Sequence, residues 1–169
     1  MSATTSVLLD TSFLITLIDK NRPHHATAEK YYRYMLQTEL PMYFSAIVAS
    51  EFAVKQSITD LPMKNFRHLH FNIPHGQTAA ALWNCLGPRD EGDDRHVVRD
   101  DVKLIAQASH ENIGFILTED TSTLHNYCER LRIAGKIETH SITLKGGFDI
   151  NVFNKHPQKK LDLNGNAAT

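Results

Sequence analysis

The chain has few cysteines, no long hydrophobic run and no excess of charge of either sign. Although 41% of its 169 residues are hydrophobic, no apolar stretch reaches the ~18–20 residues that a membrane-spanning helix needs. The N-terminus has neither the basic segment nor the apolar stretch of a signal peptide. The two cysteines, Cys85 and Cys128, form no C-x-x-C pattern, so we expect reduced thiols in or near the core. These absences favour a cytoplasmic protein without a membrane partner.

The balance of charge excludes few classes of function. With 18 basic and 19 acidic side chains, the formal net charge is −1, which argues against indiscriminate coating of nucleic acid but not against a locally basic groove. The ten histidines include an adjacent pair, His24 and His25, but no H-x-H or H-E-x-x-H spacing. We therefore expect surface or helix-capping histidines rather than metal ligands.

Strand-like and helix-like segments alternate along the chain. Strands are expected at residues 7–9, 41–45, 115–118 and 138–144, with another extended piece near 70–74. Helices are expected after a cap at Thr11 and Ser12, after a cap at Ser45, and over residues 24–37, 76–86, 100–112 and 122–135. This alternation predicts an α/β fold, with three α/β/α layers around a central, mostly parallel sheet of about five strands.

The C-terminal region differs in composition from the rest. We interpret residues 1–147 as one domain and residues 148–169 as a partly disordered extension, whose first apolar side chains could still pack on the body. The stretch 87–96, GPRDEGDDRH, is a charged loop. Its acids could bind a metal ion, but a solvated loop is the simpler interpretation.

Two acidic residues follow directly on predicted buried strands. Asp10 comes after the apolar residues 7–9, and Asp120 lies just beyond the apolar segment 115–118. A charge in such a place costs several kcal/mol unless something pairs with it. In parallel sheets ligands bind outside the carboxyl ends of the strands, which is where both residues are expected.

Two further acids occupy apolar helix faces. At helical spacing, Asp101 is followed by Leu104, Ile105 and Ala108, whereas Asp100 has a mostly polar line with Lys103 and Gln107. Glu51 is likewise flanked by apolar residues at helical spacing, namely Ile47, Val48 and Val54. Each acid alone could be an N-cap or a salt-bridge partner. Together, four carboxylates at one sheet edge need a counter-charge, and an all-oxygen ligand set favours Mg²⁺ or Mn²⁺ over zinc.

Four segments resemble those of PIN-domain proteins, in a layout similar to the VapC-type ribonuclease toxins. They are VLLDTSFLI (residues 7–15), FSAIVASEF (44–52), and the helix and strand of DVKLIAQASHENIGFILTED (101–120). The resemblance implies a metal-dependent nuclease with catalytic Asp10, Glu51, Asp101 and Asp120. It implies metal ligation by Asp10, Asp101 and Asp120, with Thr11, Ser12 and Thr118 as supporting hydroxyl groups. Ser122 stands where many members have a further Asp.

The resemblance further implies an endoribonuclease acting on RNA, with an antitoxin protein as partner if the chain is a toxin, and a homodimer. The aromatic helix around Tyr31 is one candidate dimer contact, with core packing as the alternative. Lys55 and Lys103 lie near the acids and could contact phosphates, or be plain surface lysines. The alternative function is a non-catalytic PIN-like module that binds RNA or a protein. A haloacid-dehalogenase-type phosphatase fits poorly, because Ser12 stands where its second Asp is needed.

Overall fold

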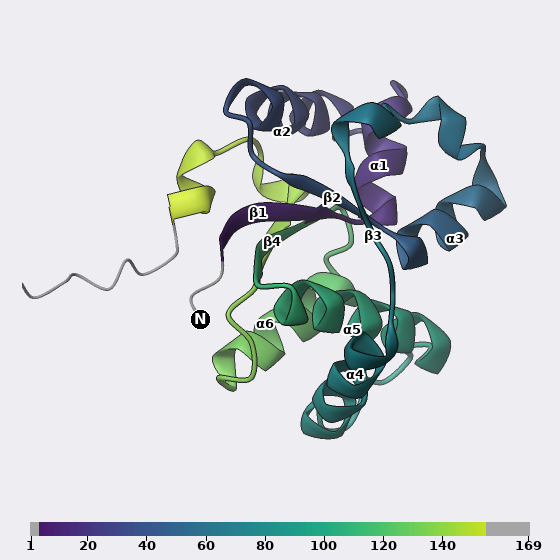
Figure 1. Ribbon diagram of the computed structural model, residues 1–169, viewed down its shortest axis with the longest axis vertical. Helices are drawn as coiled ribbons and strands as arrows, with labels where there is room; N and C mark the ends of the chain where they lie inside the picture. Colours follow the sequence, from purple (N-terminus) through teal and green to yellow (C-terminus); the bar gives the residue numbers. More distant parts are fainter. Residues whose placement is uncertain (1–3, 155–169) are drawn as a thin grey trace, which may run out of the picture.

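Five parallel strands form one sheet in the order β3-β2-β1-β4-β5, in the computed structural model, which describes residues 4–154. Helices α1, α2 and α3 lie on one side of the sheet and α4, α5 and α6 on the other (Figure 1). The three-layer α/β/α prediction is therefore confirmed. The elements are β1 (Thr4–Leu9), α1 (Thr11–Ile18), α2 (His25–Gln37), β2 (Met42–Ser45), α3 (Ala46–Lys55), β3 (Arg67–Leu69), α4 (Ile73–Cys85), α5 (Arg95–His110), β4 (Ile113–Thr118), α6 (Leu124–Ile133) and β5 (His140–Thr143).

Strands β1 and β4 form the centre of the sheet and lie where the strand order reverses. From β1 the chain proceeds outward to β2 and β3, whereas β4 and β5 continue on the other side of β1. Leu8 pairs with Ile116 and Leu9 with Leu117, and these four side chains are fully buried. The sequences of central parallel strands are continuous apolar runs, because helices cover both faces of the sheet. In parallel sheets such a reversal is where ligands bind, outside the carboxyl ends of the two strands, here β1 and β4.

The helix that follows β1 begins one residue earlier than the sequence suggested. The N-cap of α1 is Asp10 itself, whose side chain accepts a hydrogen bond from the Ser12 backbone, whereas Thr11 is already helical. A carboxylate is a good N-cap because it accepts hydrogen bonds from otherwise unpaired N–H groups. The expected cap of α3 is confirmed, since Ser45 accepts from the backbone of Ile47.

Helix α5 is attached to the far edge of the sheet by a buried amide. Gln107 is fully buried, although it belongs to the mostly polar line that includes Asp100. The Ser45 hydroxyl donates to Gln107 Oε1 at 2.5 Å, and Gln107 Nε2 donates to the carbonyl oxygen of His70 at 3.1 Å. Polar side chains are buried when such bonds satisfy them, and helical periodicity alone does not show this.

Strand β3 lies at residues 67–69 rather than near 70–74, and α4 starts at Ile73. This edge strand, Arg67-His68-Leu69, is short and largely exposed, so its sequence carries no apolar signal. Asn72 and His75 form a capping box at the start of α4, with a proline in its first turn. Helix α5 also starts earlier than expected, at Arg95, because Asp94 caps it.

The loop before α5 is bound tightly to α6. Arg130 Nη2 lies 2.7 Å from Asp90 Oδ1, and Asn126 donates to Asp90 Oδ2 at 2.8 Å. The Tyr127 hydroxyl donates to Asp93 Oδ2 at 2.6 Å. These acids of the 87–96 loop are thus held by side chains of α6, which orders the start of the helix that carries Asp101.

The first part of the expected C-terminal extension packs on the body. Phe153 is 6% exposed, and its ring centroid lies 5.3 Å from that of Phe115 and 6.0 Å from that of Tyr31. Phe148 and Ile150 remain 37% and 45% exposed. The rest of the extension, 155–169, lies outside the described residues. Among residues 4–154, no helix is both long enough and apolar enough to cross a membrane.

The two cysteines are free, but their surroundings differ. Cys128 is fully buried, as expected, and burial raises the pKa of its thiol to about 12. Cys85 is exposed at the end of α4, so the expectation that both thiols lie in or near the core is wrong for Cys85.

Candidate active site

Asp10 lies directly after the end of β1 and is 7% exposed. The Ser12 hydroxyl donates to Asp10 Oδ2 at 2.6 Å, and the Thr118 hydroxyl donates to the same oxygen at 2.8 Å. Burial raises the pKa of the Asp10 carboxyl, and the hydrogen bonds from Ser12 and Thr118 offset part of the rise. The predicted supporting hydroxyl groups Ser12 and Thr118 therefore orient Asp10 directly.

Asp120 lies two residues beyond β4, in the turn that precedes α6, whose N-cap is Thr123. Its Oδ1 accepts from the backbone and hydroxyl of Ser122, at 2.7 and 2.8 Å, and its Oδ2 accepts from the Thr123 hydroxyl at 2.5 Å. The Asp120 N–H donates to Thr118 Oγ1 at 2.9 Å. Burial alone would raise the pKa of this carboxyl, but the hydrogen bonds lower it overall. Thr118 thus links Asp10 and Asp120, which come from neighbouring strands.

Glu51 extends from α3, where the hydroxyl of Thr11 donates to its Oε2. Burial raises the pKa of Glu51, and the carboxylates of Asp10 and Asp100 raise it further. The hydrogen bond from Thr11 and the charge of Lys55 oppose this rise. The third predicted supporting residue, Thr11, therefore positions Glu51 at the same end of β1 as Asp10.

Asp101 is the one of the four acids that has a buried side-chain oxygen without a hydrogen bond. Its Oδ2 is buried and has no hydrogen-bond partner among the described residues. Burial raises the pKa of Asp101 to about 7, and the nearby carboxylates of Asp10, Asp120 and Glu51 add to the rise, while Thr123 opposes it. An oxygen of this kind costs free energy unless a cation or proton satisfies it.

The chemistry of the four acids, all of them oxygen ligands, is the kind that a hard divalent cation prefers. All four predicted acids are oxygen donors that affect one another electrostatically, and one of them has an orphaned buried oxygen. Mg²⁺ and Mn²⁺ prefer carboxylate and water oxygens, whereas zinc sites usually contain His or Cys. Asp10, Asp101 and Asp120 thus have the ligand chemistry for such an ion, although among the described residues no three of the four acids bring ligand atoms within 4.8 Å of one another.

The two lysines considered as phosphate contacts have different surroundings. Lys55 is exposed at the end of α3 and lowers the pKa of Glu51, so it lies near the acids. Lys103 Nζ lies 2.7 Å from Asp100 Oδ1 and forms a salt bridge with it.

Comparisons with known proteins concern the fold. No family model and no curated protein matches this sequence. Among the solved structures that resemble it, FitAcB from Neisseria gonorrhoeae aligns at a TM-score of 0.56 and 14% identity, over 82% of this chain and 98% of that one. VapBC2 from Rickettsia felis, bound to a DNA fragment from its promoter, aligns at 0.54 and 14%, over 81% and 97%. DNA-bound VapBC from Salmonella typhimurium aligns at 0.50 and 16%, over 82% and 98%. The chain has the VapC-like PIN-domain fold.

Within this VapC-like fold, Thr123 is a site residue that the sequence reasoning did not select. It donates to Asp120 from both its hydroxyl and its backbone, and it lowers the pKa of Asp101. The order Asp120-x-Ser122-Thr123 before a helix is a typical capping pattern, which could have indicated it. Ser122, in place of a further acid, serves as a hydrogen-bond donor to Asp120.

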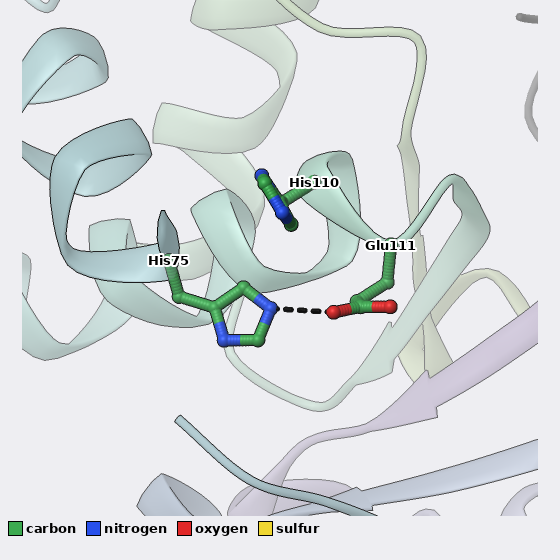
Figure 2. Close-up of side chains that lie close together, drawn as sticks. All are labelled: His75, His110 and Glu111. Atoms are coloured by element: carbon green, nitrogen blue, oxygen red, sulfur yellow. Dashed lines mark hydrogen bonds and ion pairs between the residues drawn. The ribbon is translucent and has the colours of Figure 1, made fainter. Parts of the chain in front are cut away.

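A different group of possible ligands, which includes none of the four acids, lies between α4 and the end of α5. Potential ligand atoms of His75, His110 and Glu111 lie within 4.8 Å of one another (Figure 2). However, the Asn72 N–H donates to His75 Nδ1 at 3.1 Å, so the proton of the neutral ring is on Nε2, which lies 2.6 Å from Glu111 Oε1. A metal on Nε2 would require the proton to move to Nδ1, against that N–H. The geometry therefore supports the capping histidine that the sequence suggested.

Proposed function

We propose that this protein is a metal-dependent endoribonuclease that hydrolyses RNA phosphodiester bonds. The observation that supports this most strongly is the buried, unpartnered Oδ2 of Asp101 among three further carboxylates at the switch point of the sheet. A structural role would satisfy that oxygen with a protein donor, as happens at Asp10 and Asp120.

Each acid has a distinct role in this proposal. Asp10, Asp101 and Asp120 hold one or two Mg²⁺ or Mn²⁺ ions, and the hydroxyl groups of Ser12 and Thr118 keep Asp10 in place. A bound ion of this kind supplies charge stabilisation for an in-line phosphoryl displacement. The raised pKa of Glu51 suits it to accept a proton from the attacking water, and Thr11 orients it.

The preference for RNA and the wider biological role rest on the fold. Two of the similar structures are VapBC assemblies on DNA, one of them on a fragment of the assembly's own promoter. We infer that this chain is the toxin of a toxin–antitoxin pair, that an antitoxin protein is its partner, and that it forms a homodimer in the cytoplasm.

A cleavage assay with a paired control tests the nuclease. Labelled structured RNA is incubated with the protein and Mn²⁺ or Mg²⁺, or with EDTA, beside Asp10→Asn, Asp101→Asn and Asp100→Asn. We expect cleavage that requires metal, Asp10 and Asp101. Asp100→Asn should retain metal-dependent cleavage, because Asp100 pairs with Lys103 rather than carrying the orphaned oxygen. Full metal-dependent activity in Asp101→Asn would refute the proposal.

The alternative is a PIN-like module that binds RNA or a protein without cleaving. Asp120 favours it, because protein donors satisfy both of its oxygens without any ion. Calorimetry separates the two functions. Absence of Mn²⁺ binding at millimolar concentration would support the binding module, whereas binding that Asp101→Asn abolishes would support the nuclease.

A further inference from the structure

A pocket of about 370 Å³ lies between α4 and α5, and none of the four predicted acids lines it. Its volume is in the range of ordinary small-ligand sites. One wall carries the half-buried aromatic rings of Phe71 and Trp83, and the other carries Arg95 and Arg99 from the first turns of α5. Aromatic faces beside cations form the combination that binds single-stranded nucleic acid, by base stacking and phosphate contact.

The two arginines are available to a ligand. Both are exposed, and neither forms a salt bridge with any residue between 4 and 154. By contrast, Arg22, Arg130 and Arg132 each lie within 3 Å of a carboxylate oxygen. Lys103, which also lines the pocket, is neutralised by Asp100. In a chain with a net charge of −1, such a local pair of free cations is where a polyanion would bind.

The pocket is on the same helix as Asp101 but on a different flank. Successive residues of an α-helix are rotated by about 100°, so Arg99 lies about 40° from Arg95, whereas Asp101 lies about 200° beyond Arg99. A nucleotide in the pocket would therefore not occupy the cleavage centre. The nucleotide in the pocket would belong to the same RNA strand as the scissile phosphate, but at a different position along it.

We propose that the α4–α5 pocket binds one nucleotide of a single-stranded RNA, with its base against Trp83 and Phe71 and its phosphate on Arg95 and Arg99. This inference extends the proposed nuclease function by adding a substrate site remote from the carboxylates. It predicts that RNA binding depends on α4, although no residue of α4 takes part in cleavage.

The fluorescence of Trp83, the single tryptophan of the chain, reports on the pocket directly. A single-stranded RNA of about 12 nucleotides is titrated in EDTA, where the proposed metal-dependent cleavage cannot occur, and quenching of the emission is followed. We expect saturable quenching that weakens as salt rises, because phosphate contacts release counterions.

Two neighbouring alanines of α4 provide a matched pair of variants. Ala80 lines the pocket and is exposed, so Ala80→Leu fills the space while the helix stays intact. Ala81 is also exposed but does not line the pocket. Ala80→Leu should weaken RNA binding by about fivefold or more, because it blocks stacking. Ala81→Leu should bind like the wild type.

Charge variants test the phosphate contact. Arg99→Gln should reduce the slope of log affinity against log salt by about 0.7, the loss of one phosphate contact on a single strand. Arg33→Gln on α2, whose side chain is 70% exposed, removes a cation elsewhere and should leave the slope unchanged. Absence of quenching, equal effects of Ala80→Leu and Ala81→Leu, or a slope unaffected by Arg99→Gln would each overturn the pocket assignment.

The outcomes also separate this inference from the nuclease proposal. Quenching in a protein that never cleaves RNA would support the pocket assignment and refute the nuclease. Metal-dependent cleavage without quenching would support the nuclease and refute the pocket assignment. Asp101→Asn should retain the full quenching signal, since Asp101 is on the other flank of α5.

Discussion

Replacing Asp101 by Asn should stabilise the metal-free protein at alkaline pH while removing its activity. Burial and three neighbouring carboxylates raise the pKa of Asp101 from 3.8 to about 7. Between these two values the folded state holds a proton that the unfolded chain has released. The contribution of Asp101 to the stability of the metal-free protein is therefore fully present below about pH 4 and is lost as the pH rises to about 7.

The size of the effect follows from the shift. A rise from 3.8 to about 7 corresponds to about 4 kcal/mol at 1.36 kcal/mol for each pH unit, if the whole difference is expressed. Asn has no charge to desolvate. Its side-chain amide can donate a hydrogen bond to a neighbouring carboxylate, whereas Oδ2 of Asp101 receives none. We expect a gain of about 2–4 kcal/mol at pH 8, or a melting temperature higher by roughly 5–10 °C.

Urea unfolding in EDTA at pH 5 and pH 8 measures this. The wild type should be the less stable at pH 8, and Asp101→Asn should remove most of the difference. Asp100→Asn is the control, because Asp100 has a lysine partner. Some pH dependence should persist, since burial also raises the pKa of Asp10 and Glu51. Equal wild-type stability at both pH values, or an Asn variant weaker at pH 8, would refute the reasoning.

Three further substitutions test the parts that hold the site. Thr118→Val keeps the shape but removes a buried hydroxyl that serves Asp10 and the Asp120 backbone, so it should cost about 2 kcal/mol in urea unfolding and most of the cleavage rate. Tyr127→Phe should cost about 1–2 kcal/mol and speed hydrogen exchange across residues 87–94, because it releases Asp93. Phe153→Ala should cost about 3 kcal/mol in the same unfolding assay while cleavage persists, since Phe153 packs on the far side of the core.

The centre of the fold was predictable because its signals are local and strong. The apolar strands that become β1 and β4, and the acids after them, stand out against polar surroundings. Periodicity also distinguished Asp101 from Asp100, and the structure gives the orphaned oxygen to Asp101 and a lysine partner to Asp100. These inferences needed no knowledge of which segments pair.

Features that depend on long-range pairing were missed. Strand β3 is polar and becomes a strand through its pairing with β2, which no local pattern indicates. Gln107 was assigned to a polar line, yet its amide is satisfied by Ser45 and His70, which lie far from it in sequence. In the same way, the free pair Arg95 and Arg99 is recognisable only once α4 brings Trp83 beside them.

The four carboxylates differ in how far hydrogen bonds within the folded protein satisfy them. Asp10 is the N-cap of α1, and Asp120 accepts hydrogen bonds in the turn before α6, so hydrogen bonds that the fold needs in any case already hold them. Asp101 lies within α5, where the backbone N–H groups are used by the helix itself and cannot reach its side chain. Thr123 opposes the rise in the pKa of Asp101 only in part, so a proton or a bound cation would satisfy the remaining oxygen. If a divalent ion does so, adding Mn²⁺ at pH 8 should stabilise the wild type but not Asp101→Asn, because binding to the folded state alone raises stability.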